Sequence, residues 1–335
     1  MNLTQRARIL FSPVIALLCI SSLSALEIKE GRIKLVLNED AGRFTAYYLN
    51  DVRTNKYTAL FLDQDPRTTV LSVIIGNKVY RMGESAGFSQ SVEKTVSGAR
   101  YTWKSNMIEA GEDFSFIKSK NSPLADGIKI AITIKNISEQ DLSIGIRYLI
   151  DTYLGEKSNL HFRTDSISRI TNETSFSGRS MPKYLVSYSE DSGIPGLQIM
   201  TQVEGISIPD NVIIANWKRL NDNTWSYEVN TTRNFNQLPY SINDSAACLY
   251  YNPVQLARNK AMTITLVMGS FVEEGFNITE AAKPSTGISE IFDKTIIQPS
   301  PTGSGGNEID ISVQTDLISV TDLISKINAK LSSGE

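Results

Sequence analysis

One stretch of the sequence, "GIRYLIDTYLGEKSNLHF" (145–162), gathers the side chains best suited to chemistry. It carries Arg147, Asp151, Glu156 and His161. An arginine and an aspartate can bind a polar ligand, and a histidine is the side chain best placed for proton transfer near neutral pH. Catalysis would need a convergent partner for the histidine. The alternative is a strand with an outward-facing polar pair that runs into its loop.

His161 is the only histidine among 335 residues. A zinc centre with two or three histidines is therefore excluded, and the sequence contains no G-x-S-x-G motif of the α/β-hydrolase type. We expect no catalytic residue, no metal and no cofactor, and we interpret His161 as a surface-loop residue. If this region binds a ligand, we expect Arg147, Asp151 and His161 to make the polar contacts.

Two further acidic pairs have simpler explanations. Asp63 and Asp65 lie in "FLDQDPRTT", where aspartates cap turns. A calcium loop would need more oxygen ligands. Glu112 and Asp113 in "GEDF" indicate a solvated turn. Cys248 alternates with apolar neighbours, which favours an inert thiol in the core.

Three aromatic residues lie close together in the sequence: Trp217, Trp225 and Tyr227. In sandwich folds such residues are usually partly buried and keep a polar atom bonded. The alternative is an exposed platform on which sugar rings stack. Both interpretations stay open at this stage.

The elements that would position these residues are strands. In "GIKIAITIKN" (127–136) every second residue is isoleucine, and alternation resumes from Leu142 to Ile150 after the polar turn "ISEQD". Two alternating runs around a short turn predict a β-hairpin. Its return strand would place Arg147, Leu149 and Asp151 on the face opposite the isoleucines.

The same pattern recurs along the chain. Hairpins are predicted at 31–49 around Gly42, at 70–82 around Gly76–Asn77 and at 92–105 around Ser97–Gly98. About a dozen strands and no helix before residue 285 indicate an all-β protein, a large antiparallel β-sandwich over residues 26–283. Later strands are predicted at "KYLVSYS", "GLQIMTQVE", "NVIIANW", "WSYEVN", "SAACLYY" and "AMTITLVMG".

The first 25 residues resemble a secretory signal peptide. Arg6 and Arg8 precede the apolar run "ILFSPVIALLCI", and small residues follow in "SSLSA". The run is too short to span a bilayer, so we expect no transmembrane span after cleavage. Lipidation at Cys19 is a weaker alternative because the large Leu18 precedes it.

The composition limits the cellular compartment and the kinds of partner that we expect. The net charge is −3, so no nucleic-acid surface is expected, since that requires clustered lysine and arginine. Removal of the signal would leave Cys248 as the only cysteine, which prevents an intramolecular disulfide. Export without disulfides favours the periplasm or envelope of a bacterium.

The C-terminal part differs in composition. Residues 284–308 are rich in proline, serine and glycine, as in a flexible linker. Residues 309–333 are predicted to form an amphipathic helical tail. Its apolar residues are spaced 4, 3, 4, 3 and 4 apart, the pattern of a contact face for a partner or a second copy: Val313, Leu317, Val320, Ile324, Ile327 and Leu331.

Three segments carry a resemblance to known proteins. "IKIAITIKNISEQDLSIGIRYLIDTYLGE" and "DSAACLYYNPVQLARNKAMTITLVMGSF" resemble strands of exported bacterial β-sandwich proteins, and "IKLVLNEDAGRFTAYYL" is similar to the start of galactose-mutarotase-like super-sandwiches. The resemblance implies the fold. Mutarotase chemistry implies paired histidines, which a chain with one histidine lacks.

These observations favour a non-enzymatic structural or protein-interaction protein of the bacterial envelope, whose C-terminal helix docks on a partner or self-associates. Docking of the helix back on its own sandwich stays open as well. The alternative is a carbohydrate-binding module or a degenerate carbohydrate-active enzyme. It would use Trp217, Trp225 or Tyr227 for stacking on a glycan.

Overall fold

The computed structural model describes residues 25–51, 53–62, 65–188 and 196–278. All of them belong to one compact unit, Met1–Gly287, and a second unit comprises Ile288–Glu335. The predicted signal peptide (apart from Ala25), the linker and the helical tail with its contact face lie outside the described residues. Within them no helix is long and apolar enough to cross a membrane.

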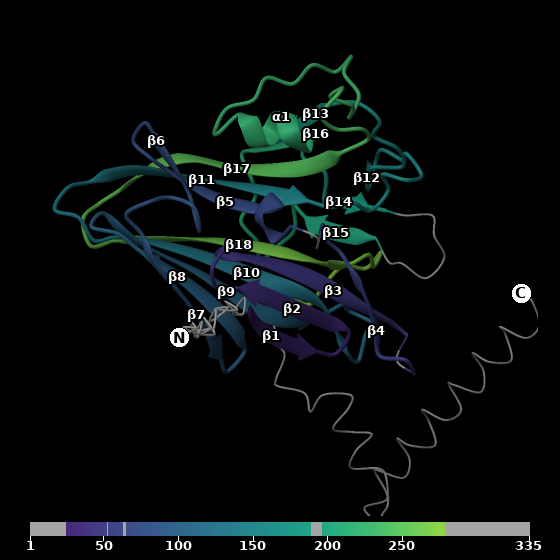
Figure 1. Cartoon of the computed structure of the whole chain (residues 1–335), viewed down its shortest axis with the longest axis horizontal. Coiled ribbons are helices and arrows are strands. Elements are labelled where there is room, and N and C mark those ends of the chain that lie inside the picture. The colour runs from purple at the N-terminus through teal and green to yellow at the C-terminus, as the bar shows by residue number, and fades with distance from the viewer. Residues whose placement is uncertain (1–24, 52, 63–64, 189–195, 279–335) are drawn as a thin grey trace, which may run out of the picture. The chain divides into compact units, whose positions relative to one another are not determined.

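Antiparallel strands are the main regular elements of the described part (Figure 1). In chain order the elements are β1 (Ala25–Glu30), β2 (Ile33–Asn38), β3 (Arg43–Asp51), β4 (Lys56–Ala59), a 3-10 turn η1 (Pro66–Thr68), β5 (Val70–Ile75), β6 (Lys78–Arg81), β7 (Ser89–Thr95), β8 (Gly98–Lys104), β9 (Ile108–Lys118), β10 (Ala125–Asn136), β11 (Leu142–Asp151), β12 (Phe162–Thr164), β13 (Thr174–Ser177), a second 3-10 turn η2 (Gly178–Ser180), β14 (Tyr184–Ser187), β15 (Leu197–Met200), β16 (Asn211–Asn216), α1 (Trp217–Asp222), β17 (Ser245–Leu256) and β18 (Ala261–Ser270).

The strands form two large sheets and a smaller one. An eight-stranded sheet has the order β12-β14-β15-β18-β10-β9-β8-β7, and a six-stranded sheet has the order β13-β16-β17-β11-β5-β6. The remaining strands make the four-stranded meander β1-β2-β3-β4. Residues of all three sheets share one buried apolar cluster, so the predicted antiparallel β-sandwich is confirmed.

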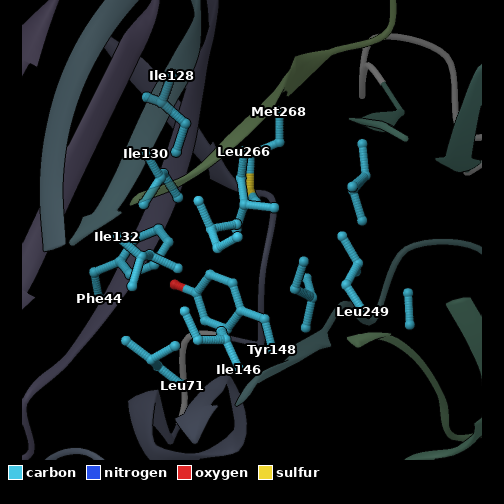
Figure 2. Close-up of a cluster of buried hydrophobic side chains, with 14 of the residues drawn as sticks. Phe44, Leu71, Ile128, Ile130, Ile132, Ile146, Tyr148, Leu249, Leu266 and Met268 are labelled. Carbon is cyan, nitrogen blue, oxygen red and sulfur yellow. The ribbon is translucent and has the colours of Figure 1, made fainter. Parts of the chain in front are cut away.

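The predicted pairing of β10 with β11 is wrong, although their alternation is right. β10 pairs with β9 and β18, whereas β11 pairs with β5 and β17 in the other large sheet. The turn between them crosses from one sheet to the other. The isoleucine rows of both strands therefore meet in the core between the sheets, as Figure 2 shows for Ile128 to Ile132 opposite Ile146 and Tyr148.

The three short hairpins are confirmed. β2 pairs with β3, β5 with β6 around Gly76–Asn77, and β7 with β8. In the last hairpin Thr95 pairs with Gly98, so the loop is Val96–Ser97, one residue earlier than predicted. Gly42 and Gly76 have φ values of 58° and 59°, a left-handed conformation that glycine adopts without steric cost.

The outer face of the six-stranded sheet is covered rather than open to water. The helix α1, which the sequence analysis missed, and the segment 223–244 lie over β16 and β17 (Figure 1). The stretch "WSYEVN" in this segment is not a strand, contrary to the prediction. Its alternating apolar residues, Tyr227 and Val229, instead pack on a second apolar cluster around Leu149, Cys248 and Tyr250.

Candidate functional site

The residues singled out at the end of β11 do converge on one place in the fold. Asp151 pairs with Ala246 across β11 and β17, so the loop that follows β11 starts beside the residues that lead into β17. Glu156 and His161 in that loop thereby meet Ser245. The Glu156 Oε1 atom accepts a hydrogen bond from the Ser245 backbone N–H at 3.3 Å.

His161 forms a line of hydrogen bonds with a serine and an asparagine. Its Nδ1 atom lies 2.8 Å from the Ser245 hydroxyl, and its Nε2 atom lies 3.1 Å from Oδ1 of Asn159. Because an amide oxygen only accepts, the tautomer that satisfies both contacts carries its proton on Nε2, and the Ser245 hydroxyl donates to Nδ1. The serine, the histidine and the asparagine are thus arranged like a nucleophile, its general base and the group that orients the base.

Burial prevents this line from acting on an outside substrate. Ser245 is 0% exposed and His161 is 1% exposed, and the imidazole packs 4.5 Å from the Phe235 ring centroid. Burial, with a contribution from Arg169, lowers the pKa of His161 to about 4. A base so weak is poorly matched to proton abstraction at neutral pH. The prediction of a surface-loop histidine is wrong, because the ring is buried and its hydrogen bonds join the loop to Ser245.

Three carboxyl groups surround the same sheet end, and each holds its proton more tightly than usual. Burial and the Asp244 carboxylate raise the pKa of Asp151 to about 7, and the same two causes raise the pKa of Glu156 to about 8. Burial raises the pKa of Asp244 to about 6. Clusters of this kind occur at functional sites but also in structural networks. Asp151 is buried, whereas Glu156 and Asp244 are half-buried.

Within the described ranges, His, Cys, Asp and Glu side chains nowhere group in threes that could hold a metal ion. These carboxyl groups keep their protons to a higher pH than exposed carboxyl groups do, because the neutral forms avoid the desolvation and mutual repulsion that carboxylates would suffer there.

Arg147 lies apart from this cluster. The structure buries it beneath α1, where its Nε donates to the Tyr250 hydroxyl at 3.1 Å and Nη2 donates to the Leu220 carbonyl at 2.7 Å. The expected outward-facing pair with Asp151 is therefore wrong, because both side chains lie under covered surface. Cys248, beside Arg147, is fully buried, as predicted, and burial raises the pKa of its thiol.

The aromatic residues pack rather than form an open platform. Trp217 is half-buried and its indole N–H donates to the Thr68 carbonyl at 2.9 Å. Trp225 meets the Tyr250 ring edge-on at 6.1 Å. Tyr227 donates to Glu173 at 2.7 Å and also borders an open, polar pocket with Asn223, Asn230 and Arg233 among its lining residues.

Two acidic residues have roles that the sequence analysis missed. Glu112 lies inside β9, not in a solvated turn, and its Oε1 accepts a hydrogen bond from the buried Tyr148 hydroxyl at 2.6 Å. Burial raises the pKa of Glu112 to about 7. Its alternation with Ala110 and Phe114 was the available signal that it points inward.

Glu173 is the second of these residues. It is fully buried and receives Arg219 Nη1 at 2.7 Å, the Tyr227 hydroxyl and the Asn230 N–H. It thus ties α1 to the covering segment. Asp65, by contrast, caps η1 as predicted, accepting from the Arg67 N–H at 3.0 Å. Asp63 lies outside the described residues.

Comparison with known proteins gives a likeness of fold. Neither a family model nor a curated protein matches the sequence. A galactose mutarotase related enzyme from Lactobacillus acidophilus is 10% identical and aligns over 75% of this chain and 99% of its own, with a TM-score of 0.41. A candidate aldose 1-epimerase from Escherichia coli K12 is 8% identical over 73% and 98%, with a TM-score of 0.39. A polysaccharide lyase is 9% identical over 75% of this chain, which spans only 34% of that protein, with a TM-score of 0.42.

Proposed function

We propose that this chain is a non-enzymatic interaction protein, exported to the bacterial envelope, whose sandwich presents one apolar loop to a protein partner. The observation that carries the proposal is the exposure of Leu238, Tyr240 and Ile242. These side chains are 72%, 72% and 69% exposed and lie within five consecutive residues. Single exposed apolar residues are ordinary, but a contiguous group marks a contact surface.

The loop is held in place by hydrogen bonds, so its apolar side chains are displayed and not merely loose. The backbones of Gln237 and Ser241 bond to each other, at 2.9 and 3.0 Å. The amide of Asn216, which is fully buried, lies 2.8 Å from the Ser241 hydroxyl and 3.0 Å from the Asp244 carbonyl. A preorganised loop loses little conformational entropy when it binds.

The charges around the loop favour a protein over a membrane as its partner. Lys218 Nζ lies 5.7 Å from the Tyr240 ring centroid but is ion-paired with Asp222 at 3.0 Å. Anionic lipid attracts surfaces with several unpaired cations, whereas the whole chain carries a net charge of −3. The contact surface of a partner protein needs only a matching apolar patch.

The buried state of the candidate catalytic residues supports the non-enzymatic part of the proposal. The hydroxyl of Ser245 and the ring of His161 are engaged with each other beneath the surface. Export is supported by the signal-like first 25 residues, and the C-terminal contact face remains a second proposed docking element. Removal of residues 303–335 separates the two elements: partners that survive the deletion belong to the loop.

The test replaces all three loop side chains by serine. The variant Leu238→Ser/Tyr240→Ser/Ile242→Ser should fold normally, because exposed substitutions shift stability by only about 0.5 kcal/mol. It should lose the complexes that the wild type forms in native envelope extracts, measured as apparent mass by size exclusion. Val96→Ser, at a 92% exposed residue of another loop, is the matched control. Complexes of unchanged mass in the triple variant would refute the loop's role.

A carbohydrate-binding role is favoured by a separate observation, the polar pocket of about 580 Å³ beside Tyr227. Its lining of amide, hydroxyl, carboxyl and guanidinium groups suits sugar hydroxyls, with the Tyr227 ring as one wall. Glu228 lines the pocket and is exposed, so Glu228→Ala should abolish retention on a glycan array without unfolding the protein. An array on which the wild type binds nothing would rule this function out.

A further inference from the structure

A small pocket is lined in part by the loop that carries His161. It has a volume of about 220 Å³ and is lined by Leu160, Phe162, Arg163, Ser168, Arg169 and Tyr188. Its two arginines come from different segments, because Arg163 is in β12 and Arg169 is in the loop after it. The volume suits a ligand smaller than those of most small-molecule sites.

The guanidinium of Arg163 is held by aromatic rings and not by a carboxylate. Its Cζ lies 4.4 Å from the ring centroid of Phe271 and 5.3 Å from that of Tyr188. Its buried Nε has no hydrogen-bond partner. Rings stacked on the faces of a guanidinium leave its N–H edge free to donate.

Arg169 is a second positively charged side chain that lines the same pocket. Its Nη2 donates to the Asn159 carbonyl at 3.0 Å, which anchors one nitrogen and leaves other donors available. Ser168, which is exposed, supplies a hydroxyl beside it. The positive charge of Arg169 also contributes to lowering the pKa of the neighbouring His161.

Two other arginines that the fold holds in place have acidic partners, whereas Arg147 bonds only to neutral groups. Arg43 pairs with Glu84 at 3.1 Å, and Arg219 pairs with Glu173 at 2.7 Å. In the described part of the chain no carboxylate forms an ion pair with Arg163 or Arg169. Among the described residues, therefore, the two guanidinium groups that line this pocket have no acidic partner, and an external anion would complete this charge arrangement.

We propose that Arg163 and Arg169 form a binding site for a small ligand with an oxyanion group, a carboxylate or a phosphate, whose body rests against the Tyr188 ring. The two guanidinium edges donate to the oxyanion and Ser168 donates a further hydrogen bond. The site is separate from the apolar loop at residues 238–242 and does not depend on its function.

The experiment is calorimetric titration of the full chain at low salt with three probes: D-glucuronate, inorganic phosphate and D-glucose. At least one of the two anions should bind with one-to-one stoichiometry, more weakly as sodium chloride is added, and glucose should not compete with it. Glucuronate alone would identify a carboxylate ligand, phosphate alone a phosphate ligand, and both outcomes support the site.

Variants locate the binding. Arg163→Gln and Arg169→Gln should each weaken it at least about tenfold, since each removes charge-assisted hydrogen bonds. Arg179→Gln, at an exposed arginine outside the pocket, changes the net charge equally and should leave the affinity unchanged. Should Arg163→Gln fail to fold, Ser168→Glu provides the test at an exposed position, because its carboxylate would occupy the guanidinium groups and abolish binding. The proposal is overturned if neither anion binds the wild type, or if binding survives in the folded pocket variants.

Discussion

Replacing Asp151 by asparagine tests whether the end of β11 holds a carboxyl group that stays protonated in the folded protein. The side chain is 3% exposed, and burial is the main reason that its pKa rises to about 7. Asparagine has the same shape and no charge. The substitution therefore removes the titration while leaving the packing nearly intact.

The sign and size of the effect follow from the two pKa values of Asp151. The unfolded chain releases this proton near the ordinary value of 3.8, whereas the folded chain holds it to about 7. Between these values the folded state binds more protons, so the free energy of unfolding falls as the pH rises, and the decrease caused by Asp151 reaches its full size above about pH 7. At about 1.4 kcal/mol for each pKa unit, the loss reaches up to about 4 kcal/mol.

The measurement is urea unfolding of the wild type and Asp151→Asn at a series of pH values from 4 to 9. The variant should match the wild type near pH 4 and exceed its free energy of unfolding by up to about 4 kcal/mol near pH 8.5. Asp222→Asn, at an exposed aspartate of α1, is the control for the loss of one carboxyl group and should give no comparable gain near pH 8.5. Parallel profiles for the wild type and Asp151→Asn would contradict the reasoning, because they would mean that Asp151 is ionised in the folded protein.

Further predictions concern the other buried polar groups. Tyr148→Phe should lower the free energy of unfolding by about 1–3 kcal/mol, because it removes the hydrogen bond to the buried Glu112. Urea unfolding measures this, and an unchanged midpoint would contradict it. The ring nitrogens of His161, followed by NMR, should titrate near pH 4, since burial lowers the pKa to that value; a midpoint near 6.5 would mean that water reaches the ring. Ser245→Ala should keep the ring neutral at pH 6 and cost about 1 kcal/mol of stability through the lost hydroxyl bond. Arg147→Met should cost about 1–3 kcal/mol and speed hydrogen exchange in α1, whose carbonyl oxygen at Leu220 loses its donor; exchange at the wild-type rate would show that α1 is held by other contacts.

Local alternation was enough to predict most of the longer strands and three hairpins, but not the sheet in which β11 would lie. The isoleucine rows of β10 and β11 were correctly placed inward, yet the two strands lie in different sheets. Burial of an alternating face is satisfied equally by a hairpin and by two strands facing each other across a sandwich. The choice depends on the partners β5, β9, β17 and β18, which come from distant parts of the chain.

The position of the candidate site in the fold was predicted correctly, but its residues were wrongly expected to be exposed. Asp151, Glu156 and His161 do meet at the end of β11, as their spacing allowed. Their burial depends on the covering segment 223–244, whose path follows from the Glu173–Arg219 ion pair and from Asn216. These are contacts between residues far apart in the chain. No periodicity within β11 could have indicated them.

The apolar loop was missed because its three exposed side chains look, in sequence, like those of an ordinary strand. In "QLPYSIND" apolar and polar residues nearly alternate, which normally indicates one buried face. The structure shows instead a turn closed by the Gln237 and Ser241 backbones, with Leu238, Tyr240 and Ile242 directed outward.

The most direct test of the proposed function is photo-crosslinking from position 240 in living cells. A benzophenone amino acid in place of Tyr240 should give a discrete crosslinked species of protein, and Leu238→Ser/Ile242→Ser in the same chain should remove it. The same probe in place of Val96, which is also strongly exposed, should give none. Crosslinks to lipid alone, or an identical pattern from positions 96 and 240, would contradict the assignment of the loop as a protein-docking surface.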